Sequence, residues 1–123
     1  MTTTFEELGG APFFERLVAA FYDRVEHDPI LRPMYPDDLT SSKYWFALFL
    51  QQYFGGPGEY SEKKGHPRLR MRHGHLQIGV AARDAWFDAM VGAIEEVGIA
   101  EPVRSAMLEY FETSADWMIN SEH

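Results

Sequence analysis

The sequence predicts an all-α protein, and three observations carry that prediction. Apolar residues recur every three or four positions in four long segments, which is the spacing of one face of an α-helix. Proline and glycine punctuate these segments, where helices begin and end. No segment alternates apolar and polar residues as a half-buried β-strand does. The 123 residues suffice for one domain with a single core or one enclosed cofactor.

The first two helices are predicted by their boundary residues. Thr4 stands where the N-cap of a short helix is expected, and Gly9-Gly10 follows the end of that helix. Pro12 then stands where a first helical residue should, because proline has no N–H to leave unpaired. The apolar spacing continues until Asp28-Pro29, so we expect the second helix to stop there.

A corner and a third helix are expected next. Pro33 and Pro36 exclude a long helix between residues 30 and 38, so this stretch is expected to be a short turn or corner. An apolar face resumes from Leu39 to Phe54 and is ended by Gly55-Gly56-Pro57. The third helix is therefore expected to span residues 39–54.

The second half of the chain is expected to begin irregularly and to end in two helices. Residues 58–67 are polar and lack periodicity, which indicates a loop, and residues 68–78 are expected to hold a short helix. Longer helices are expected over about 81–97 and 101–119, the first closed by Gly98. The overall plan is four main helices and one irregular connection.

Charge and composition exclude several classes of function. The formal net charge of −8 disfavours nucleic-acid binding, and no apolar run approaches the roughly 20 residues that cross a bilayer. The absence of cysteine excludes disulfides, iron–sulfur clusters and covalently attached c-type haem. We therefore expect a soluble, cytoplasmic protein without membrane partners, in which His, Tyr or Met would coordinate any iron.

The segment 63–75, KKGHPRLRMRHGH, gathers five of the eleven lysines and arginines of this acidic chain. A solvated surface explains most such runs, and the alternative is a site for an anion. A haem presents two carboxylates at the edge of an apolar ring, so its axial imidazole lies close to basic groups. His73 and His75 are about 200° apart around a helix, so only one could face the iron, and the spacing does not choose between them.

Three large polar aromatic residues also suggest a site. Tyr22 and Trp86 fall on apolar helix faces, and Tyr35 lies in the proline-rich corner. Each brings a hydrogen-bond donor that needs a partner when it is buried. Ordinary core packing with the polar tip at the surface is the alternative that the residues alone leave open.

Several stretches of the chain resemble group II truncated haemoglobins. The glycine pairs Gly9-Gly10 and Gly55-Gly56, the stretch MYPDDL at 34–39, QQYFGGPGEYSEKKGHPRLRMRH at 51–73 and ARDAW at 82–86 are all similar to that family's pattern. The resemblance runs from end to end. It implies a single globin domain over residues 1–123, built as a two-over-two helical sandwich around haem b.

The resemblance also implies a role for individual residues. His73 stands at the position of the proximal iron ligand, and His75 is then not a ligand. On the opposite, distal side, the match to the family's polar triad falls on Tyr22, Tyr35 and Trp86. On the distal helix, the family pattern places Phe46 above the haem and Ser42 where a small side chain would leave a path for ligands.

The remaining implied contacts hold the haem. Trp45 takes a place where family members often carry a basic residue that reaches a propionate, so other residues are expected to bind the propionates. Those residues are Arg70, Arg72 and Tyr60, and the further implied cofactor contacts are Phe49 and Ile78.

The implied function is reversible binding of dioxygen and other diatomic ligands, nitric oxide and carbon monoxide among them, and the sequence does not choose between oxygen transport and chemistry on the bound ligand. A phenol or indole donor worth about 1 to 3 kcal/mol would slow ligand release by about tenfold to a hundredfold. Slow release suits oxidation of nitric oxide or reaction with peroxide. Such chemistry needs an external reductase, and the protein is expected to be a monomer or homodimer. The competing hypothesis is a cofactor-free helical interaction domain whose segment 63–75 binds an acidic partner.

Overall fold

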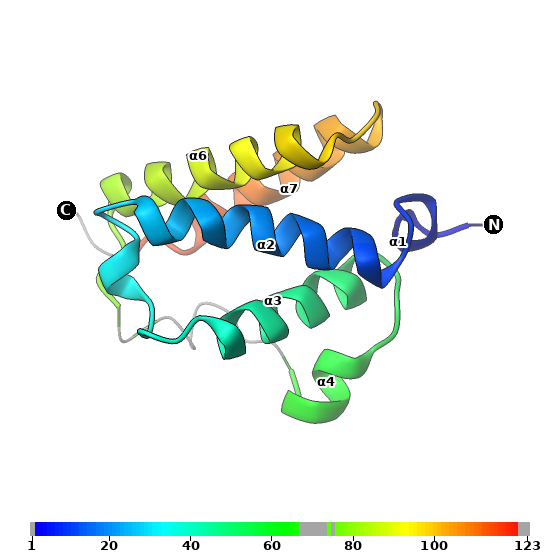
Figure 1. Cartoon of the computed structure of the whole chain (residues 1–123), viewed down its shortest axis with the longest axis horizontal. Helices are drawn as coiled ribbons and strands as arrows, with labels where there is room; N and C mark the ends of the chain where they lie inside the picture. The colour runs from blue at the N-terminus through cyan, green and yellow to red at the C-terminus, as the bar shows by residue number, and fades with distance from the viewer. Residues whose placement is uncertain (1, 67–73, 75, 121–123) are drawn as a thin grey trace.

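The computed structural model describes residues 2–66, 74 and 76–120 (Figure 1). Within these residues every regular element is helical, which confirms the all-α prediction. The elements, in chain order, are α1 (Thr4–Glu7), α2 (Ala11–His27), a 3-10 turn (Arg32–Met34), α3 (Thr40–Tyr53), α4 (Glu59–Lys64), α6 (Val80–Val97) and α7 (Val103–Trp117). The four long helices α2, α3, α6 and α7 are the four that the apolar spacing predicts.

These four helices form two antiparallel pairs. Figure 1 shows α2 running in one direction with α3 returning below it, and α6 running beside α7 in the opposite direction. Helix α2 packs against both α3 and α6, so it joins the two pairs. This arrangement is the expected two-over-two sandwich.

Two local predictions are wrong. The N-cap of α1 is Thr3, not Thr4, because the side chain of Thr3 accepts a hydrogen bond of 3.1 Å from the backbone N–H of Glu6. The expected loop at 58–67 contains helix α4. The acidic residues in its first turn and the lysines in its last turn interact favourably with the helix dipole. Apolar spacing does not reveal this stabilisation, so the helix was not expected. Of the helix expected at 68–78, the described end from Leu76 to Ile78 is irregular.

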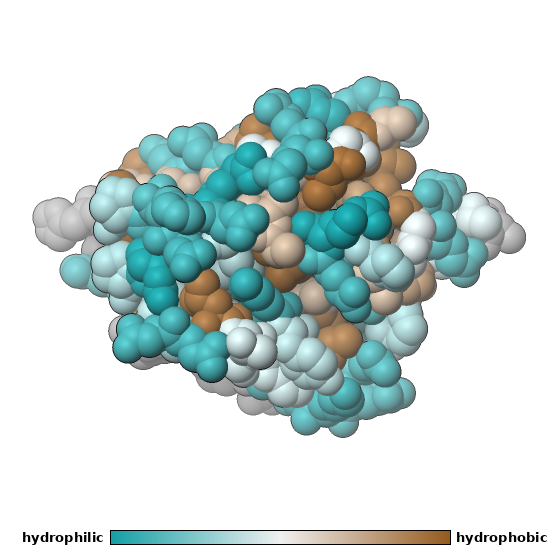
Figure 2. Space-filling model, in the orientation of Figure 1, coloured by the Kyte–Doolittle hydropathy of each residue, from teal (hydrophilic) through white to brown (hydrophobic). Residues whose placement is uncertain are grey.

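The core lies between the two helix pairs. Its fully buried large side chains come from all four long helices, among them Phe14 and Phe21 of α2, Leu50 of α3, Met90 and Ile94 of α6, and Met107 and Phe111 of α7. Figure 2 shows hydrophilic residues over most of one face, with hydrophobic ones in small separate patches. None of the helices in the described ranges has the length and apolar content to span a bilayer.

Candidate functional site

The three polar aromatic residues singled out in the sequence come together in the structure. Tyr22 of α2 and Tyr35 of the corner meet edge to face, with ring centroids 5.5 Å apart and planes at 87°. The indole N–H of Trp86, on α6, donates a hydrogen bond to the phenol oxygen of Tyr35. Tyr22 is 4% exposed, and the other two side chains are half-buried. Residues from three separate segments therefore form one cluster.

Aromatic rings surround this cluster on its apolar sides. The ring of Phe46, on α3, lies 6.3 Å from that of Tyr22 and 6.5 Å from that of Trp86. Phe21 lies 5.5 Å from Trp86 and 5.6 Å from Phe46, so it connects α2 to both partner helices. Ser42 is half-buried one turn before Phe46 on α3, and the structure gives it no ring or hydrogen-bond contact with the cluster.

Burial keeps both phenols protonated. Removal from water raises the pKa of Tyr22 far above its ordinary value of 10.0, and the neighbouring Tyr35 raises it further. Burial also raises the pKa of Tyr35 to about 12, and the hydrogen bond from Trp86 opposes that rise. Because neither phenol loses its proton at neutral pH, each can act as a hydrogen-bond donor.

The Tyr22 hydroxyl tests whether these residues fit a haem-bound ligand. Tyr22 is buried, and because burial raises the pKa of its phenol, the hydroxyl keeps its proton. It lies among the rings of Phe21, Phe46 and Tyr35, in surroundings too apolar to solvate a charge. A protonated phenol in an apolar place fits a small polar ligand held by haem.

A second aromatic group lies where α3 meets α4. The buried ring of Tyr60 is 5.6 Å from that of Phe49 and 6.0 Å from that of Trp45, and the Nζ atom of Lys64 lies 4.6 Å from the Trp45 ring centroid. Two of the expected cofactor contacts, Phe49 and Tyr60, are therefore neighbours. Ile78, the third that the structure describes, is buried just before α6 and belongs to neither aromatic group.

The expected iron ligand and two of the three expected propionate partners lie outside the described residues. These are His73, Arg70 and Arg72. Within the described residues no group of His, Asp and Glu side chains is arranged to hold a metal ion.

Sequence reasoning did not assign Phe21 and Lys64 to the site. Phe21 repeats at core spacing like its neighbours, so nothing in the sequence separates it from an ordinary core residue. Lys64 belongs to the basic segment, but its contact with Trp45 depends on α4, which the sequence did not predict.

Comparisons with known proteins agree along the whole chain. The chain is 39% identical to the group 2 truncated hemoglobin YjbI of Bacillus subtilis (strain 168), over 90% of this chain and 84% of that protein. The crystal structure of a haemoglobin from Chloroflexus aurantiacus matches 98% of this chain and 99% of its own, with 51% identity and a TM-score of 0.95. The group II truncated haemoglobin of Bacillus anthracis matches 100% of this chain and 95% of its own, with 37% identity and a TM-score of 0.96.

The two-over-two helical sandwich and its buried polar aromatic cluster define the chain as a globin. Residues 3–120 match the family model described as bacterial-like globin. The chain belongs to this family, as a truncated haemoglobin of group II.

Family membership settles the coarse function. Globins enclose haem b and bind diatomic gases such as dioxygen at its iron, so haem b is the cofactor of this chain and ligand binding is haem-based. The competing hypothesis of a cofactor-free interaction domain is therefore set aside.

Proposed function

We propose that the protein, as one globin domain over residues 1–123, holds dioxygen tightly for reaction with a second small molecule. The observation that carries the proposal is the cluster of Tyr22, Tyr35 and Trp86, in which the ring of the buried Tyr22 lies 5.5 Å from that of Tyr35 and burial keeps both phenols protonated. A globin that only delivers oxygen gains little from such a donor, because the donor slows release. We infer that nitric oxide is the second molecule, because it is a small ligand that can reach oxygen in an enclosed pocket.

In this proposal His73 is the proximal ligand, and the propionates are bound by Arg70, Arg72 and Tyr60. Phe49 and Ile78 supply further apolar contacts to the macrocycle. When bound, the haem supplies an iron that takes up a diatomic ligand and passes electron density to it. Every other contribution comes from the side chains around the ligand.

The distal donors have distinct roles. Tyr22 would donate a hydrogen bond from its hydroxyl to a small ligand that the haem holds. Trp86 has a single N–H, and because that N–H is given to Tyr35, it orients Tyr35 and leaves the Tyr35 proton available as a second donor. Phe46 and Phe21 exclude water, which strengthens both hydrogen bonds. Ser42 leaves a path for ligands on the same helix as Phe46.

The working form requires an electron donor. We propose that the protein acts in the cytoplasm with a reductase, as a monomer or homodimer. Its net charge of −8 favours a donor with a basic docking face.

Oxygen release from the ferrous protein, followed by stopped-flow mixing, tests the proposal. Tyr22→Phe should release oxygen about tenfold to a hundredfold faster than the parent protein, which corresponds to one hydrogen bond of about 1 to 3 kcal/mol. Tyr44→Phe is the matched control, because Tyr44 is an exposed tyrosine of α3 whose hydroxyl pairs with Lys63. Parent release as fast as from a storage globin would remove the reason for the proposal.

The second arm measures the reaction itself. The oxygenated protein mixed with nitric oxide should yield one nitrate per site, and the yield in Tyr22→Phe should fall as oxygen escapes before it reacts. Release of intact oxygen without nitrate from the parent protein would contradict the assignment of nitric oxide while leaving tight oxygen binding in place.

A further inference from the structure

Asn120 joins the C-terminal end of the described chain to the segment that precedes α6. Its backbone N–H donates to the carbonyl oxygen of Ile78 at 2.8 Å. Its side-chain oxygen accepts from the N–H of Ile78 at 2.8 Å, and its side-chain nitrogen donates to the carbonyl of Leu76 at 2.9 Å. We call these three contacts the Asn120 clasp.

The segment from Leu76 to Ile78 is irregular, so its backbone groups have no helical partners. Buried backbone N–H and C=O groups must find partners elsewhere, and Ile78 is 7% exposed. Asn120 satisfies both polar backbone groups of Ile78 and one of Leu76. Only an amide side chain offers an acceptor and a donor side by side in this way, since a carboxylate lacks the donor.

The residue that makes the clasp is itself held in place. Helix α7 ends at Trp117, three residues before Asn120. The Asp116 carboxylate accepts a hydrogen bond of 2.8 Å from Nε of Arg83, on the first turn of α6. The backbone N–H of Ile119 then donates to the carbonyl of Asp116 at 3.2 Å. These contacts fix Asn120 relative to α6. The clasp therefore fixes residues 76–78 relative to α6 as well.

Leu76 and Ile78 stand three and five residues after His73 in the sequence. We propose that Asn120 is a positioning residue for the proximal side of the haem: by fixing Leu76 and Ile78, it fixes the chain that carries His73. This inference rests on the proposed role of His73 as iron ligand. The inference predicts that a contact far along the chain, just after α7, controls the strain and persistence of the iron–imidazole bond.

Removal of the clasp by Asn120→Ala should change three measurements. The iron–histidine stretching band of the ferrous protein, read by resonance Raman, should shift or broaden. Haem transfer to an acceptor apoglobin should accelerate about fivefold to tenfold, as expected when two hydrogen bonds are lost. The amide proton of Ile78 should lose protection from hydrogen exchange, a measurement that does not depend on haem.

Two further variants make the test selective. Asn120→Asp keeps the acceptor for the Ile78 N–H and loses the donor to Leu76, so its effects should be intermediate and should remain measurable if Asn120→Ala folds poorly. Thr113→Ala changes an exposed residue of α7 and should leave the band, the transfer rate and the exchange unchanged.

Loss of Ile78 protection with an unmoved band and an unchanged transfer rate would overturn the inference, because the clasp would then be structural only. Unchanged hydrogen-exchange protection of the Ile78 amide in Asn120→Ala would also overturn the inference, because the clasp would then not hold Ile78 in place. A failure of the proposed function at His73, as iron ligand, would look different. The iron–histidine stretching band would then persist in His73→Gly, whatever the Asn120 variants do.

Discussion

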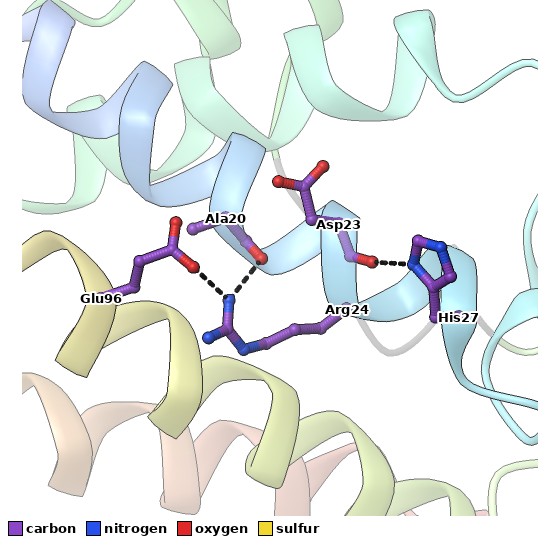
Figure 3. A network of polar contacts seen from close by, with 5 residues as sticks. All are labelled: Ala20, Asp23, Arg24, His27 and Glu96. Atoms are coloured by element: carbon purple, nitrogen blue, oxygen red, sulfur yellow. Dashed lines mark hydrogen bonds and ion pairs between the residues drawn. The ribbon is translucent and has the colours of Figure 1, made fainter.

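The side chain of Arg24 lies directly over Gly92, at the place where α2 crosses α6. A Cβ atom added at Gly92 would collide with Nε of Arg24 and would stand 3.2 Å from Cδ and Cζ of the same side chain. From this position the guanidinium donates to Glu96 of α6 at 2.9 Å and to the carbonyl of Ala20 at 3.1 Å (Figure 3). The absence of a side chain at Gly92 thus sets the approach of the helices that carry Tyr22 and Trp86.

A double-mutant cycle isolates this contact. Gly92→Ala alone should be neutral or slightly destabilising, because the gain in helix propensity, about 1 kcal/mol, is offset by displacement of Arg24. In an Arg24→Ala background the same change should stabilise by about 1 kcal/mol, since the collision is gone. Urea unfolding of the four proteins measures the coupling. Equal effects of Gly92→Ala in both backgrounds would show that Arg24 moves away without cost.

Gly56→Ala should destabilise the protein by about 1 to 3 kcal/mol. A Cβ at Gly56 would lie 2.6 Å from Cδ2 of Phe5 and 2.8 Å from the backbone oxygen of Gln51, the same oxygen that accepts from the Gly56 N–H at 2.7 Å. The change therefore pushes α1 away from the end of α3. At this place the backbone N–H of Phe5 donates a hydrogen bond to the backbone oxygen of Phe54 at 2.8 Å.

Thermal unfolding of Gly56→Ala beside Gly58→Ala checks this expectation. A Cβ at Gly58 meets only the end of the Gln52 side chain, at 3.8 Å, so that variant should unfold close to the parent protein. Similar losses in the two variants would attribute the effect to the loss of glycine flexibility rather than to α1 docking.

The sequence predicts the long helices well because each buries one face and is bounded by proline or glycine. It also singles out Tyr22, Tyr35 and Trp86 as large polar aromatic residues, but only the resemblance places them in one site, because three residues on separate segments have no common local signal. The hydrogen bond from Trp86 to Tyr35 and the position of Phe21 depend on how α2 crosses α6. The role of Asn120 could not be predicted, because its partners are backbone atoms 42 and 44 residues away.

Stability should fall in alkaline solution, and Tyr35 should contribute to the fall. Burial raises the pKa of Tyr35 from 10.0 to about 12 in the folded protein, so the unfolded chain loses this proton first as the pH rises. The contribution is fully present below about pH 10 and is lost between about pH 10 and 12, by about 2 to 3 kcal/mol at 1.4 kcal/mol per pKa unit.

Urea unfolding at a series of alkaline pH values measures this loss, and Tyr35→Phe should flatten the curve over that interval. Tyr22, whose pKa is also raised, remains in the variant, so the dependence should weaken without vanishing. An identical pH dependence with and without the Tyr35 hydroxyl would place the alkaline transition elsewhere in the chain.

Haem retention should depend on the arginines of the basic segment. Arg72→Ala should accelerate haem transfer to an acceptor protein, because the proposed propionate partner is lost and Trp45 supplies no charge in its place. Arg104→Ala removes a half-buried arginine that pairs with the exposed Glu95 and Glu101, and it should leave the transfer rate unchanged. Equal rates in the two variants would exclude Arg72 as a propionate partner.

Tyr22→Phe should weaken ligand retention and stabilise the haem-free fold at the same time. Tyr22 is buried among aromatic rings, where a hydroxyl that is not hydrogen-bonded costs about 1 to 3 kcal/mol, so its removal should raise the free energy of unfolding by about 1 kcal/mol. Tyr110→Phe is the contrast, because the Tyr110 phenol is hydrogen-bonded with Ser114 and its loss should destabilise. Denaturant unfolding of both haem-free variants measures whether each change raises or lowers the free energy of unfolding. A destabilised Tyr22→Phe would mean that its hydroxyl already has a partner in the protein, and the proposed donor to the ligand would then have to be Tyr35.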